Sequence, residues 1–239
     1  MENIVLNVLN LNKSYNRGKS YTVKDISFSV NSGSIVGLVG KNGAGKSTII
    51  KSITGVIPFE VGNITIAGFD VKTNSIEAKK HLGYVPDVCN AFDKMTGMEY
   101  LNFVADIFNV SKNERKEKIL DFENHFTLGK SMHKLISSYS HGMKQKISLM
   151  ASLIASPKLW ILDEPTTGLD PQTTNLLLKY IKEYAQKGNA VLFSSHNLDI
   201  VERVCDKAII IKKCKIIANL NIEEFKNKNE EEISKYFME

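Results

Sequence analysis

Eight consecutive residues carry the strongest chemical signal in this sequence, and they read Gly40-Lys41-Asn42-Gly43-Ala44-Gly45-Lys46-Ser47. They fit the P-loop pattern G-x-x-x-x-G-K-[ST]. Glycines let backbone N–H groups crowd around phosphate oxygens, and a helix that follows them adds a favourable dipole. Lys46 can reach the β- and γ-phosphates of a nucleotide, and Ser47 can hold Mg²⁺. The segment predicts a phosphate-binding site made by Gly40, Asn42, Gly43, Ala44, Gly45, Lys46, Ser47 and Thr48.

Two carboxylates form the second signal, because they end the apolar stretch Leu159-Trp160-Ile161-Leu162-Asp163-Glu164. A strand of this kind delivers both acids to its C-terminal end, where ligands bind in open α/β sheets. Asp163 would support Mg²⁺, and Glu164 would polarise an attacking water. An apolar strand that ends in acids is common by itself. Together with the P-loop it predicts a site for phosphoryl transfer.

The elements that must position these residues alternate between strands and helices. The apolar stretch Ile35 to Val39 comes directly before the P-loop, and a helix from Lys46 to about Thr54 follows it, which argues against a chance match of a glycine-rich turn. Alternating or β-branched runs predict further strands at Ile4 to Leu9, Asp25 to Val30, Asn63 to Ala67, Leu82 to Val85, Leu159 to Leu162, Ala190 to Phe193 and Ala208 to Ile211.

The middle of the chain has a different character. Thr96 and Glu99, and again Ser111 and Glu114, have the spacing of a capping box before helical patterns. Further helices are expected over residues 142–155, 170–187 and 221–237. The prediction is an α/β fold in which residues 87–158 form an inserted helical subdomain within a single domain, 1–239.

Composition excludes several classes of protein. Of the 239 residues, 43% are apolar, which is enough for a folded core. The 31 basic and 26 acidic residues leave a net charge of 31 − 26 = +5, which is dispersed and does not form the concentrated stripe of a nucleic-acid binder. Three cysteines without a CxxC spacing favour neither a disulfide framework nor a zinc site. No uncharged apolar run approaches the roughly 18 residues that a spanning helix needs.

Over nearly its whole length the chain resembles the nucleotide-binding subunit of ATP-binding cassette (ABC) transporters, on these two motifs and their surroundings. Leu159 to Glu164 looks like the Walker B strand with its catalytic glutamate, and Gly168-Leu169-Asp170 looks like the D-loop. Ser194-Ser195-His196 looks like the switch-histidine segment, so that His196 would contact the γ-phosphate. Tyr15 is similar to the aromatic residue that stacks on adenine, with Tyr21 as a nearby alternative.

Two positions depart from the family pattern. The signature, usually Leu-Ser-Gly-Gly-Gln, appears as Tyr139-Ser140-His141-Gly142-Met143, which retains Ser140 and Gly142 for phosphate binding. This variation is similar to that of drug- and bacteriocin-resistance exporters. Asp87 stands where the family usually has the Q-loop glutamine, and its carboxylate can still accept hydrogen bonds from metal-bound water.

The resemblance implies a P-loop NTPase core with a mostly parallel sheet, an N-terminal antiparallel β part and the helical insertion. It also implies an ATPase that uses ATP and Mg²⁺, with Lys46, Glu164 and His196 as catalytic residues and Ser47, Asp87 and Asp163 at the metal. The expected partners are a separate transmembrane permease, through which the chain would sit on the inner face of the cell membrane, and a second copy of the chain in a head-to-tail dimer. Export of a small molecule or peptide is favoured over import, and no nucleic-acid partner is expected.

Two other functions compete with this interpretation. A soluble ABC-type ATPase that acts on ribosomes or nucleic acid would commonly carry two cassettes or long inserts, whereas this chain has one P-loop. A P-loop GTPase or kinase is the other alternative. A GTPase would need a guanine-reading Asn-Lys-x-Asp segment, and neither Asn10-Leu11-Asn12-Lys13 nor Asn227-Lys228-Asn229-Glu230 fits it.

Overall fold

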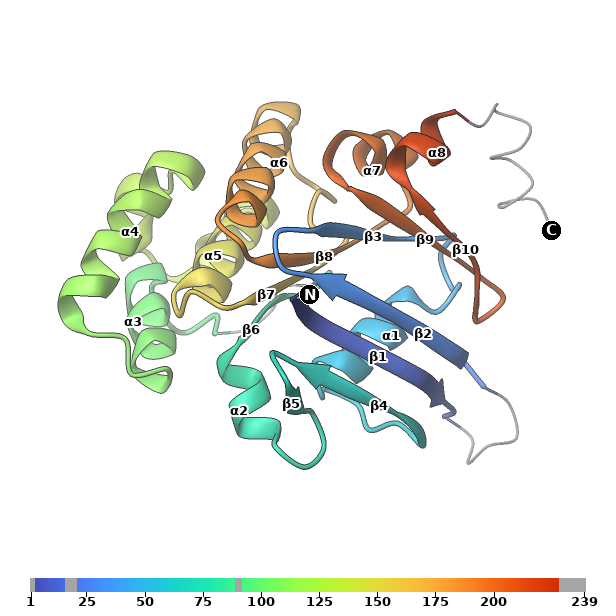
Figure 1. The fold of residues 1–239 in the computed structure, drawn as a ribbon. Coiled ribbons are helices and arrows are strands. Elements are labelled where there is room, and N and C mark those ends of the chain that lie inside the picture. The colour runs from blue at the N-terminus through green and yellow to red at the C-terminus, as the bar shows by residue number, and fades with distance from the viewer. Residues whose placement is uncertain (1–2, 16–20, 89–91, 228–239) are drawn as a thin grey trace.

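Two β-sheets and a set of surrounding helices make up the computed structural model, which describes residues 3–15, 21–88 and 92–227 (Figure 1). The first sheet is antiparallel and has the strand order β2-β1-β4-β5. Its strands are β1 (Ile4–Lys13), β2 (Val23–Asn31), β4 (Val61–Ile66) and β5 (Phe69–Asp70). Buried and exposed residues alternate along β2, which is the pattern of a sheet with one face on the core and one in water.

The second sheet has the strand order β10-β9-β3-β8-β7-β6 and is parallel except for β10. Its strands are β3 (Ile35–Val39), β6 (Leu82–Val85), β7 (Leu159–Asp163), β8 (Ala190–Ser195), β9 (Lys207–Lys212) and β10 (Lys215–Asn221). Every residue of β3, β7 and β8 is buried, as expected for strands covered on both faces. Because these three strands run in parallel, their last residues, Val39, Asp163 and Ser195, lie at the same end of the sheet.

Eight α-helices are present in the described residues: α1 (Lys46–Ile53), α2 (Ser75–Lys80), α3 (Gly97–Ile107), α4 (Lys112–Phe126), α5 (His141–Leu153), α6 (Pro171–Gln186), α7 (Leu198–Val204) and α8 (Ile222–Lys226). Two 3₁₀ turns, η1 (Gly129–His133) and η2 (Ile136–Ser138), precede α5. Helices α3 and α4 lie at the end of the molecule away from β9 and β10 (Figure 1). They belong to the stretch 87–158, whose status as a separate subdomain stays a prediction.

The core is divided by the second sheet into two apolar clusters. Leu38 and Ile161 face α1 and the antiparallel sheet, whereas their neighbours Val39 and Trp160 face the side of α5 and α6. The alternation follows from the two-residue period of a strand. It means that Asp163, two residues after Ile161, points to the α1 side of the sheet, where the P-loop lies.

The predicted fold class is confirmed, and most predicted elements agree with the structure to within a few residues. Leu82–Val85 and Ile35–Val39 have the bounds that the sequence predicts. Four strands and α-helices were not predicted, namely α2, α7, β5 and β10, and neither were the two 3₁₀ turns. The helix expected over residues 221–237 is described only as α8, and residues 228–239 lie outside the described part. Within the described residues, no helix combines the length and apolarity needed to cross a bilayer.

Candidate active site

The P-loop joins β3 to α1 and has the backbone conformation that its glycines permit. Gly43 and Gly45 have φ of 81° and 110°, a region that residues with a Cβ rarely adopt. At Gly40 an added Cβ would lie 2.5 Å from the carbonyl oxygen of Ile211, so the close approach of β9 requires glycine there as well. The loop therefore presents backbone N–H groups at the start of α1, as an anion site requires.

A cleft of about 220 Å³ lies over this loop. It is lined by Thr22, Lys41, Asn42, Gly43, Gly45, Lys46, Ser47, Thr48, Asp87 and Glu164. An adjoining hollow of about 420 Å³ shares Lys41 and Asn42 and adds Gly40 and His196. Ala44 packs into the core below the loop. Lys46, Asp87, Glu164 and His196 come from distant parts of the sequence and thus meet at the carboxyl ends of the parallel strands. Their catalytic and metal-binding roles stay predictions.

Lys46 is the first residue of α1, and its side chain is almost fully buried. Its Nζ donates a hydrogen bond to the carbonyl oxygen of Gly40 at 2.7 Å and lies 3.2 Å from Glu164 Oε1. The other carboxylate oxygen of Glu164 lies 2.9 Å from Nδ1 of His196. Glu164 is therefore held between two groups that can carry positive charge. Its φ of 49° puts it in the left-handed region, which is strained for a residue with a side chain.

Asp163 lies behind the cleft and is buried in a hydrogen-bond network. Ser194 Oγ donates to Asp163 Oδ1 at 2.6 Å, and Ser47 Oγ donates to the same oxygen at 3.3 Å. Ser194 Oγ also accepts from the backbone N–H of Glu164 at 2.9 Å, so one hydroxyl fixes both acids. Burial raises the pKa of Asp163, and the nearby carboxylates of Asp87 and Glu164 raise it further against these hydrogen bonds.

The residues around Asp163 fit a magnesium ion. A serine hydroxyl and a carboxylate are hard oxygen donors, and Mg²⁺ in nucleotide sites is typically held by one or two such groups together with phosphate oxygens. Ser47 Oγ already contacts the carboxylate of Asp163, and Asp87 lines the same cleft as Ser47. A divalent cation there would offset the repulsion among the three carboxylates, which adds to the effect of burial on the pKa of Asp163.

Besides Ala44 and Asp163, three predicted site residues, namely Ser140, Gly142 and Tyr15, line neither this cleft nor the adjoining hollow. Ser140 caps α5 and accepts a hydrogen bond from the N–H of Met143 at 3.3 Å, and Gly142 packs near Gly168 and Leu169. Tyr15 is 63% exposed, and its ring lies 5.2 Å from the ammonium of Lys13. All three lie outside the set of residues that line the cleft of their own chain.

Three residues of the site are absent from the predicted set. Lys41 belongs to the P-loop segment and lines both the cleft and the hollow, although no role was predicted for it. Thr22 lines the cleft from the position directly before β2, and nothing in the local sequence singles it out. Ser194 had a usable signal, because it precedes His196 at the end of a predicted strand. The parallel register pairs it with Asp163.

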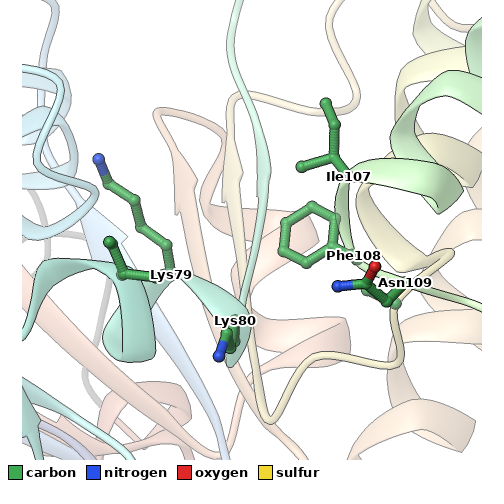
Figure 2. A pocket seen from close by; sticks show the side chains of 7 residues that line it. Lys79, Lys80, Ile107, Phe108 and Asn109 are labelled. Carbon is green, nitrogen blue, oxygen red and sulfur yellow. The ribbon is translucent and has the colours of Figure 1, made fainter.

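A second groove, of about 360 Å³, lies between α2 and the end of α3. Figure 2 shows the side chains of Lys79 and Lys80 on one side and those of Ile107, Phe108 and Asn109 on the other. Ile76 and Ala155 complete the lining. Ile76 and Ile107 are 72% and 58% exposed, so this groove has an apolar rim beside two lysines.

The fold and the P-loop site define a nucleotide-binding cassette, and comparison with known proteins gives its family. The family model described as ABC transporter matches residues 23–167, so the chain belongs to the ABC transporter family. Within that family it is an ATP-binding subunit and an ATP hydrolase.

Individual relatives agree with this assignment. The chain is 36% identical over 214 residues to the linearmycin resistance ATP-binding protein LnrL of Bacillus subtilis (strain 168), covering 90% of this chain and 68% of that protein. It is 32% identical over 212 residues to the Nod factor export ATP-binding protein I of Rhizobium sp. (strain N33), covering 89% and 69%. A solved structure of an ATP binding subunit of an ABC transporter superimposes with a TM-score of 0.90 at 29% identity, covering 96% of this chain and 98% of that one.

Proposed function

We propose that this chain is the ATPase subunit of a transporter whose permease is a separate polypeptide, and that the transporter exports a small molecule or peptide. The observation that carries the ATPase part is the contact of Glu164 with both Lys46 and His196 at the mouth of the P-loop. The names of two relatives, one a linearmycin resistance protein and one a Nod factor export protein, favour export.

In this proposal the side chains have distinct roles in hydrolysis. Lys46 and the P-loop amides bind the β- and γ-phosphates, while Ser47 and Asp163, with Asp87 nearby, would hold Mg²⁺, which neutralises phosphate charge when bound. Glu164 orients and polarises the attacking water. His196 lies 2.9 Å from Glu164 and fixes that carboxylate while it stabilises charge on the transferring phosphoryl group. Tyr15 would stack on the adenine ring.

A head-to-tail dimer would complete the site. Ser140 and Gly142 lie outside the cleft of their own chain, yet they sit at the N-terminus of α5, where backbone N–H groups favour an anion. In the dimer each α5 would meet the nucleotide held by the P-loop of the partner, so ATP would favour the closed pair.

The permease would dock at the groove between α2 and α3. Its apolar rim, formed by Ile76, Ile107 and Phe108, suits an apolar helix of the partner, and Lys79 and Lys80 suit an acidic residue on that helix. Docking there would hold the chain on the inner face of the membrane.

A pull-down from detergent-solubilised membranes of the source cells tests this proposal. We expect a stoichiometric protein with several spanning helices to co-purify with the tagged chain. Ile107→Glu should abolish that co-purification and keep nucleotide binding. The matched control is Leu120→Glu, since Leu120 on α4 is similarly exposed at 59% and does not line the groove. Recovery of ribosomes or nucleic acid in place of a membrane partner would favour the soluble ATPase, and equal behaviour of the two variants would place docking elsewhere.

A further inference from the structure

The imidazole of His141 packs on the loop that follows Glu164. His141 is the first residue of α5, and its Nε2 lies 3.3 Å from the carbonyl oxygen of Thr167. Because a carbonyl can only accept, Nε2 must carry the proton of this hydrogen bond. At Gly168, whose φ is 76°, an added Cβ would collide with the same ring. The ring therefore lies directly against the backbone of this loop.

A second side chain of α5 binds the same loop one helical turn later. Gln145 is buried, and its Nε2 donates to the carbonyl oxygen of Pro165 at 3.2 Å. Residues four apart lie on one face of a helix. His141 and Gln145 thus form a pair of donors that holds the backbone of residues 165–167.

This contact reaches Glu164 through one further hydrogen bond. The N–H of Thr167 donates to the carbonyl oxygen of Glu164 at 3.1 Å, while the carbonyl of Thr167 accepts from His141. Glu164 has a φ of 49°, a strained conformation that persists only where its surroundings fix it. Ser194 fixes the N–H of Glu164, so the turn held by His141 supplies the restraint on the other side.

We propose that His141 is a positioning residue for ATP hydrolysis, which acts through Thr167 to hold Glu164 in its working conformation. The proposal rests on the role given to Glu164 above. It assigns a function to the side chain at the position where the family signature has glycine. It also means that the start of α5 and the loop after Glu164 act together within one chain.

The test measures ATP turnover and ATP affinity of the full chain with His141 changed. His141→Gly removes the donor, and we expect kcat to fall about fivefold, the equivalent of one neutral hydrogen bond, with little change in KM or in the affinity for a fluorescent ATP analogue. His141→Gln keeps an N–H at a similar distance, as Gln145 does, and should restore most of the rate. His133→Gly, an exposed histidine of η1, is the control.

A double-mutant cycle with Gly168→Ala tests the contact itself. We expect Gly168→Ala to lower kcat less in the His141→Gly background than in the native background, because the added methyl group then has no ring to meet. Additive effects, an unchanged kcat in His141→Gly, or no recovery in His141→Gln would each overturn the proposal. A lower unfolding midpoint with normal kcat would mean a purely structural contact, which also refutes it.

The variant Glu164→Gln separates this proposal from the one on which it rests. Near-normal turnover in Glu164→Gln would remove the role of Glu164. Loss of turnover in Glu164→Gln with no change in His141→Gly would refute the positioning role alone.

Discussion

Replacing Glu164 by glutamine isolates the carboxylate charge at the centre of the site. The amide has nearly the same shape, and one of its ends can still contact His196, from which the native carboxylate lies 2.9 Å away. The substitution removes the ion pair with Lys46, whose side chain is nearly buried and whose ammonium lies 3.2 Å from Glu164 Oε1. Lys46 keeps its hydrogen bond to Gly40 and loses its anionic competitor for phosphate. We therefore expect ATP to bind Glu164→Gln at least as tightly as the native chain.

The expected loss of turnover follows from the role of the carboxylate. A positioned general base contributes about 10²- to 10⁴-fold to a rate, which corresponds to about 3–5 kcal/mol of activation free energy. An amide cannot accept the proton of the attacking water, so the variant should lose most of this factor. The loss should appear in kcat, because the ground-state contacts of the phosphates with the P-loop are unchanged.

The assay combines phosphate release with direct measurement of nucleotide affinity. Glu117→Gln is the matched control, since Glu117 is an exposed carboxylate on α4 and should leave both quantities unchanged. Turnover of Glu164→Gln within about threefold of the native rate would be too high for the general-base contribution of about 10²-fold or more. That result would refute the assignment of Glu164, and a loss of ATP binding in the variant would refute the argument about Lys46.

Two further predictions concern stability. Because the pKa of Asp163 is raised in the folded chain, its protonated form stabilises the fold fully below the unfolded pKa of about 3.9, and this contribution is lost as the pH rises through the folded value. Asp163→Asn should therefore unfold at a higher temperature than the native chain at pH 7 without Mg²⁺, and a melting series in which the gain did not shrink toward pH 4 would contradict this sign. Trp160 Nε1 donates to Ser152 Oγ at 2.9 Å, so Ser152→Ala leaves this buried N–H without its acceptor. The free energy of unfolding should fall by about 1–3 kcal/mol, and Tm by about 2–4 °C for each kcal/mol. Calorimetry measures this loss, and Ser148→Ala, also on α5, is the control.

The parts of the fold that the sequence predicted are those with strong local signals. Strand β3 and strand β6 have the predicted bounds because each is a short, mostly apolar run that begins after a polar residue and ends before Gly40 or Pro86. The capping box of Thr96 and Glu99 is present in the structure, with Thr96 N–H and Glu99 Oε2 2.8 Å apart. Such signals depend only on neighbours in sequence, so they can be read without knowing what packs on them.

The missed elements lack such signals. Helices α2 and α7 have six and seven residues, too few for a helical period to repeat. Strand β10 lies at the edge of the sheet beside β9, and its residues alternate only between exposed and half-buried. The contact of His141 with Thr167 depends on the placement of α5 against a loop 26 residues further along the chain. No local pattern encodes that placement.

The residues that depart from the ordinary rules of burial and backbone conformation gather at the end of the sheet where the site lies. Lys46 and Asp163 are charged residues with almost no exposure, and Glu164 adopts a left-handed φ. Each is unfavourable for folding by itself, and the strand and helix around it obey ordinary patterns. Their neighbours make them tolerable: Gly40 and Glu164 bind Lys46, and Ser194 binds both acids. Since these same groups would bind phosphate and Mg²⁺, the buried charges and the strained φ of Glu164 lie where a bound nucleotide would stabilise them.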